Sequence, residues 1–93
     1  MGMEYLDITF RAEKQFGVKL RIRDFVRLNC IPATRDPTAG ELHDWICQAC
    51  RAAGKPVPHS SWHRVKRIIV DATGLSPSVI RKDSLLSADL GIG

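Results

Sequence analysis

Thr38-Ala39-Gly40-Glu41-Leu42 (residues 38–42) is the clearest start of a helix in the chain. In this capping-box pattern the threonine hydroxyl accepts a backbone N–H of the first turn, and the glutamate reaches back to the threonine N–H. Gly54 and the two prolines of residues 55–58 cannot continue the helix. The stretch therefore predicts one amphipathic helix, whose apolar stripe consists of Leu42, Trp45, Ile46 and Ala49.

Helical spacing also marks the segments on both sides of this helix. Residues 3–16 predict a long helix and residues 22–28 a short one, and residues 62–73 predict a third main helix. Residues 75–93 predict a long loop with a single turn, and no segment has a strand pattern. The predicted fold class is therefore all-α, a bundle of three main helices and one short helix. Its expected core is Leu6, Phe10, Phe16, Phe25, Leu42, Trp45, Ile46, Val65, Ile68 and Ile69.

The boundaries of the first and last helices rest on local signals. Gly17 can take the left-handed conformation that ends the first helix, and Gly74 does the same for the last. Ser60 or Ser61 can cap the start of the last helix. We expect Val18 and Leu20 to point inward from a short extended link. The expected core stripe of the first helix is Met3, Leu6, Phe10 and Glu13, with Ile8 and Ala12 beside it.

The length and overall composition of the chain indicate one soluble domain. The chain has 93 residues, of which 44% are hydrophobic and 26% charged. It contains no apolar run near the roughly 20 residues that cross a bilayer, and its start does not resemble a signal peptide. We therefore expect a cytoplasmic protein whose three cysteines are free thiols. The net charge of +4 is spread along the chain without interleaved aromatic residues, which does not favour nucleic-acid binding.

A metal- or nucleic-acid-binding module is the alternative from another class. His43, Cys47 and Cys50 share one face of a helix, and with Cys30 or His59 they could form a tetrahedral zinc site. Small thiols that fill a helix face, beside a solvated histidine, are the simpler interpretation. The spacing of Cys47 and Cys50 also matches a redox motif, but no strand-to-helix turn surrounds it. No catalytic set is evident, so we do not expect an enzyme.

Three segments together resemble the acyl carrier protein family. Residues 64–75, followed by Asp83-Ser84-Leu85-Leu86-Ser87-Ala88-Asp89-Leu90-Gly91, resemble the family's first helix and long first loop. Residues 3–18, with Phe16-Gly17, resemble its second helix, and residues 38–46 resemble the start of its last helix. Each motif is short, and their joint spacing is more specific than any one of them. The resemblance implies an acyl-carrier-like four-helix bundle and a place in fatty acid or other lipid biosynthesis, as in bacterial carriers.

The order of the segments implies circular permutation. Residues 1–53 correspond to the family's second to fourth helices, residues 54–61 to a linker, and residues 62–93 to its first helix and first loop. In the family the old termini lie at one end of the bundle, so a linker of about six residues, which reaches up to roughly 20 Å, can join them. The linker looks long enough to fold back on its own chain. We therefore favour a monomer and leave a domain-swapped dimer open.

The permutation places the family's attachment site at the two ends of the chain. In the family a serine that carries 4′-phosphopantetheine follows Asp-Leu-Gly, here Asp89, Leu90 and Gly91, and precedes the second helix, here beginning at Met3. Family spacing puts Gly2 at the serine position, and glycine has no hydroxyl to form the phosphodiester. We expect no cofactor on the chain as written. A carrier whose serine was altered or cut away remains the alternative, and it would carry 4′-phosphopantetheine.

Further expectations follow from the resemblance. Ser84 imitates the family's Asp-Ser-Leu motif, but it precedes Asp89 and should be an ordinary loop serine. Leu86 and Leu90 should pack on the first helix, with Gly91 close to Met3. The flanking Met1, Gly2, Ile92 and Gly93 should be mobile. The expected partners are proteins, including acyl-transfer or biosynthetic enzymes, although Arg11 and Lys14 depart from the acidic second helix that such enzymes read.

Overall fold

The computed structural model describes residues 3–20 and 37–92, and for residues 3–6 it describes the backbone only. Helix α1 spans Met3–Phe16, α3 spans Ala39–Ala52, α4 spans Ser61–Thr73, and the 3-10 turn η1 spans Pro77–Val79. These bounds confirm the predicted main helices and the single turn after them. The short helix expected at 22–28, and Phe25 within it, lie outside the described residues. The described parts contain no strand, only an isolated bridge between Thr38 and Leu85.

Local signals set three helix ends as the sequence predicted, but the predicted serine cap at the start of α4 does not form. The Glu41 N–H donates to Thr38 Oγ1 at 3.1 Å, and the Thr38 N–H donates to Glu41 Oε1 at 3.0 Å, so the capping box is complete. Gly17 and Gly74 take φ angles of 66° and 76°, the left-handed region that ends a helix. Ser60 occupies the cap position of α4, but its hydroxyl accepts from Arg64 Nε at 3.1 Å and caps no backbone N–H.

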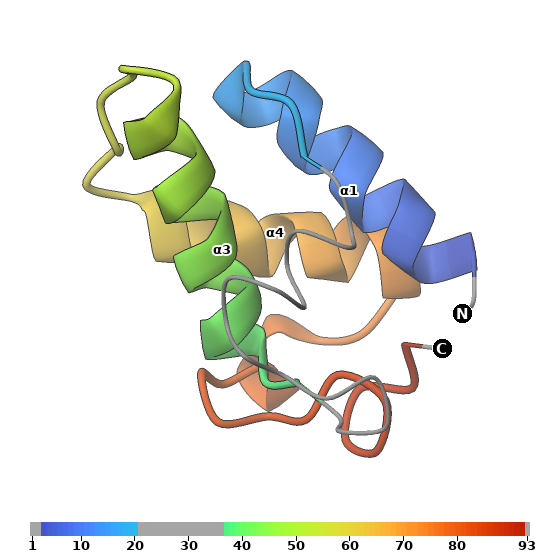
Figure 1. Ribbon diagram of the computed structural model, residues 1–93. Coiled ribbons are helices and arrows are strands. Elements are labelled where there is room, and N and C mark those ends of the chain that lie inside the picture. The colour runs from blue at the N-terminus through green and yellow to red at the C-terminus, as the bar shows by residue number, and fades with distance from the viewer. Residues whose placement is uncertain (1–2, 21–36, 93) are drawn as a thin grey trace.

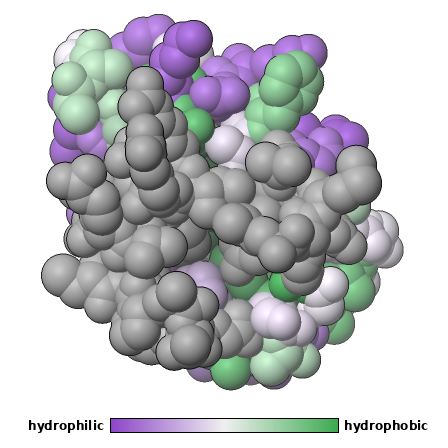
Figure 2. Space-filling model, turned by 45° about the vertical axis from the view of Figure 1, so that its right-hand side comes forward, coloured by the Kyte–Doolittle hydropathy of each residue, from purple (hydrophilic) through white to green (hydrophobic). Residues whose placement is uncertain are grey.

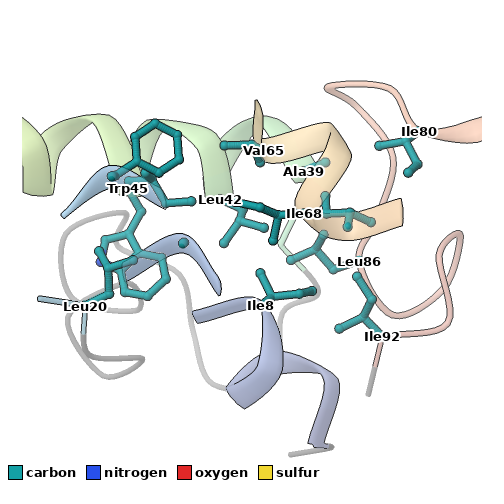
Figure 3. Close-up of a cluster of buried hydrophobic side chains, with 14 of the residues drawn as sticks. Ile8, Leu20, Ala39, Leu42, Trp45, Val65, Ile68, Ile80, Leu86 and Ile92 are labelled. Carbon is teal, nitrogen blue, oxygen red and sulfur yellow. The ribbon is translucent and has the colours of Figure 1, made fainter. Parts of the chain in front are cut away.

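Helix α4 is the centre of the arrangement, because both α1 and α3 pack on it (Figure 1). It crosses behind the other two helices in that view, and residues 75–92 then run beneath them. The buried side chains form one cluster, to which α1, α3, α4 and the loop after η1 contribute (Figure 3). Trp45, Leu42, Val65 and Ile68 lie at its centre, all no more than 2% exposed. The core predicted on α3 and α4 is thus confirmed.

The expectation that Phe10 of α1 faces the core was wrong, whereas the expected burial of Phe16 is confirmed. Phe10 is 55% exposed, whereas Ile8 and Ala12 are buried and Phe16 closes the same face. Ala12 has no exposed surface, and its small side chain lets the helix approach the cluster closely. Phe10 is half a turn away from Ile8, so it projects outward, where the Lys14 ammonium lies 4.5 Å from its ring centroid. Val18 and Leu20 are buried, as expected.

The loop after α4 is an integral part of the core. Ile80, Leu86, Leu90 and Ile92 are all buried, and Ile8 of α1 lies beside Leu86 and Ile92 (Figure 3). The predicted burial of Leu86 and Leu90 is confirmed. The expected mobility of Ile92 was wrong, because its side chain is fully buried and its N–H donates to the Leu86 carbonyl at 2.8 Å. Met1, Gly2 and Gly93, expected to be mobile as well, lie outside the described residues.

The same loop is fastened to the start of α3 through the backbone. The Gly40 N–H donates to the Lys82 carbonyl at 2.8 Å, and the Ala39 N–H donates to the Ser84 carbonyl at 2.9 Å. In return the Leu86 N–H donates to the Pro37 carbonyl at 2.9 Å. A Cβ atom on Gly40 would stand 2.8 Å from the Lys82 carbonyl oxygen, so only glycine permits this approach. The first turn of α3 and residues 82–86 therefore form one hydrogen-bonded unit.

The surface of the described residues is mostly polar. Phe10 and Val79 are the large hydrophobic side chains exposed there. Hydrophilic residues gather along the upper edge of the face in Figure 2. None of the described helices has the length and apolar character that crossing a bilayer requires.

Candidate functional site

The expected attachment region forms a defined turn at the end of the loop. The Leu85 N–H donates to Asp89 Oδ2 at 2.8 Å, so this carboxylate holds the turn together. Leu90 is buried, and the exposed Gly91 has a φ of 68° and donates its N–H to the Ser87 carbonyl at 3.0 Å. Met3 is the first residue of α1, and Gly2 lies outside the described residues. The structure thus gives Asp89, Leu90 and Gly91 a clear structural role within this turn.

Ser84 is a structural serine. Its side chain is buried, its Oγ accepts from the Arg81 N–H at 2.9 Å, and its hydroxyl donates to the Val79 carbonyl at 3.4 Å. A group esterified to this oxygen would break both contacts and would have to leave a buried position. Neither Gly2, which has no hydroxyl, nor Ser84 therefore fits a phosphopantetheine arm.

A polar cluster joins α3 to the first turn of α4. Its three members, His43, Cys47 and Ser61, are called the His–Cys–Ser cluster below. His43 Nε2 lies 2.7 Å from Ser61 Oγ and 3.4 Å from Cys47 Sγ, and Cys47 Sγ lies 3.9 Å from Ser61 Oγ. His43 and Cys47 are four residues apart and share a helix face, so both meet the residue at the start of α4. His63, two residues beyond Ser61 in the sequence, is exposed.

The environment of His43 favours the neutral form of its imidazole. Burial lowers the pKa of His43, and the Lys82 ammonium lowers it further, with Asp44 opposing and Arg51 adding a smaller lowering effect. The Trp62 ring stands edge-on to the imidazole, with ring centroids 5.7 Å apart. A neutral imidazole can accept at Nε2 the proton of the Ser61 hydroxyl. The cluster can therefore pass a proton between a thiol, a hydroxyl and a base.

The expected zinc ligands do not gather in the described parts of the chain. Cys47 lies in the His–Cys–Ser cluster, whereas Cys50 belongs to the hydrophobic core and is 1% exposed. His59 is exposed, and Cys30 lies outside the described residues. Residues 3–20 and 37–92 contain no group of three or more His, Cys, Asp or Glu side chains that could hold a metal ion. Cys47 and Cys50 are free thiols, so the redox-motif spacing forms no disulfide here.

Comparison with known proteins gives no relative from which to transfer a function. No family model, no curated protein and no solved structure matches the chain. Its function therefore has to be argued from its own residues.

Proposed function

We propose that the chain is an acyl-carrier-protein-like domain in circularly permuted order, which is not loaded at the usual site and acts through protein contacts in a biosynthetic or regulatory role. The observation that carries the proposal is the packing of the last segment. Residues 61–92 supply a helix and a long loop, and Leu86, Leu90 and Ile92 of that loop share one hydrophobic cluster with Ile8 and Ala12 of α1. This is the neighbourhood that the family order requires between first loop and second helix.

The path between α3 and α4 also supports permutation within one chain. Gly54 turns the chain with a φ of 73°, and the Lys55 N–H donates to the Cys50 carbonyl at 2.9 Å. The Lys55 ammonium contacts the Gly17 carbonyl, where α1 ends. Val57 packs against the core. The linker of residues 54–61 therefore has contacts of its own with this chain, which favours the monomer over a swapped dimer.

The surface of α1 argues for partners other than enzymes that read an acidic helix. Asp7 forms an ion pair with Arg11 at 2.9 Å, and Glu13 Oε2 accepts the Leu20 N–H at 2.9 Å. Lys14 adds a positive charge over the exposed Phe10. Two of the three acids of the helix are thus engaged within the chain. We infer a protein partner that contacts this mixed-charge helix surface and the exposed Phe10 ring.

Installing the missing hydroxyl tests the proposal. The parent chain, Gly2→Ser and the matched control Gly2→Ala are incubated with a broad-specificity phosphopantetheinyl transferase and coenzyme A, and their intact masses are measured. We expect the mass of one phosphopantetheine group on Gly2→Ser alone, since only this variant has a hydroxyl at the family position. A gain on the parent chain would contradict the claim that it is not loaded. No gain on any of the three would count against the carrier-like site.

A further inference from the structure

The proposed function assigns no role to the side chains of the His–Cys–Ser cluster. It joins the middle of α3 to the start of α4, whereas the expected attachment region is the turn of residues 85–91. Its three side chains place a thiol, a hydroxyl and a base within 2.7 to 3.9 Å of one another. The thiol and the hydroxyl are both buried, with Cys47 5% and Ser61 7% exposed. A base within hydrogen-bond distance of a thiol is the arrangement that activates a cysteine nucleophile.

We propose that Cys47 is a modification site for hydrogen peroxide and other small hydroperoxides, with His43 and Ser61 handling the proton. The cluster has little exposed surface, so the oxidant must be small. Reduction of a hydroperoxide also needs a proton for the oxygen that leaves, and the cluster supplies that proton. A larger alkylating agent is neither small enough for this position nor helped by a proton donor.

The chemistry balances within these three side chains. The Cys47 thiol gives its proton to His43 Nε2, directly across 3.4 Å or through the Ser61 hydroxyl. The thiolate sulfur attacks one peroxide oxygen, forming an S–O bond while the O–O bond breaks. The second oxygen leaves with the proton held by His43. Cys47 is oxidised to a sulfenic acid, and hydrogen peroxide is reduced to water.

Cys50 provides an internal comparison three residues away on the same helix. It is also buried, but it lies among core side chains and has no imidazole beside it. Burial raises the pKa of Cys50, the neighbouring Cys47 raises it further, and Lys55 and Arg51 oppose this. Cys50 should therefore stay a thiol and react slowly. Comparing the reaction rates of Cys47 and Cys50 therefore separates the effect of His43 on a thiol from the effect of burial in α3.

The full folded chain is treated with hydrogen peroxide, the peroxide is removed with catalase at timed intervals, and the chain is then unfolded in urea with excess dimedone, which traps sulfenic acid. Trypsin then releases residues 36–51 as one peptide, and fragment masses assign the adduct to Cys47 or Cys50. We expect Cys47 to be oxidised about ten times faster than Cys50, and His43→Gln to slow Cys47 about tenfold. The exposed His63 gives the matched control His63→Gln, which should leave the rate of Cys47 unchanged.

Ser61→Ala keeps the experiment decisive if His43→Gln does not fold, which circular dichroism would reveal. This variant retains the imidazole beside the thiol and should slow the oxidation of Cys47 by severalfold. Equal rates at Cys47 and Cys50 in the parent chain would overturn the proposal. So would an unchanged rate at Cys47 in the folded His43 and Ser61 variants, because reactivity would then reflect exposure alone.

Discussion

Replacing Leu86 by alanine tests whether the loop after α4 is part of the folding unit. Leu86 has no exposed surface and lies in the cluster with Ile8 of α1 (Figure 3). Removing a buried leucine side chain costs about 2–5 kcal/mol, and more where the surroundings cannot close the cavity. The backbone here is held on both sides, since the Leu86 N–H donates to Pro37 at 2.9 Å and its carbonyl accepts from Ile92 at 2.8 Å. We therefore expect Leu86→Ala to lower the free energy of unfolding by about 3 kcal/mol.

That loss is large for a chain of 93 residues, whose total stability should be about 5–14 kcal/mol. Urea unfolding followed by tryptophan fluorescence, to which the buried Trp45 and the partly buried Trp62 both contribute, measures it. With a slope of about 1 kcal/mol per M, the midpoint should fall by about 3 M. Val79→Ala is the matched control, because Val79 is 51% exposed and its loss should cost less than about 0.5 kcal/mol. Equal stabilities of the two variants would refute the packing argument.

Three other predictions concern α3 and α4. Gly40→Ala should destabilise the chain by about 1 kcal/mol or more in urea unfolding, although alanine is the better helix former, because its Cβ would meet the Lys82 carbonyl; a gain in stability would contradict this. Ile69→Ala, at a fully buried position, should cost about 2–4 kcal/mol by the same measurement. Because the pKa of His43 is lowered in the folded chain, stability should hold above the unfolded pKa of about 6.5 and decrease as the pH falls from there through the folded pKa. Unfolding curves of His43→Gln should lack that part of the decrease.

Three of the helix ends could be predicted because each depends on a few neighbouring residues. The Thr38–Glu41 capping box and the left-handed glycines at 17 and 74 act locally, so a single sequence contains the whole signal. The core face of α1 could not be fixed in this way. Phe10 and Ile8 both recur at helical spacing, and the close packing of Ala12 in the core decides between them.

The His–Cys–Ser cluster shows the same division between local and long-range information. The shared face of His43 and Cys47 was visible in the sequence, because the two are one turn apart on a predicted helix. Ser61 is 18 residues beyond His43, and its place depends on how α4 lies against α3. The burial of Ile92 likewise depends on the turn that its N–H closes with Leu86, which no local pattern indicates.

Restoring the family order by circular permutation tests the central proposal most directly. Gly93 is joined to Met1 by a peptide bond with no added residues, and the chain is reopened in the exposed stretch between Gly54 and Pro56. We expect a folded chain whose free energy of unfolding lies within about 1 kcal/mol of the parent, since exposed loop positions tolerate new ends. A control reopened inside α3, between Ile46 and Cys47, should not fold. If the chain reopened in the linker also fails to fold, its two ends do not meet as a carrier-like bundle requires, and the permuted account is contradicted.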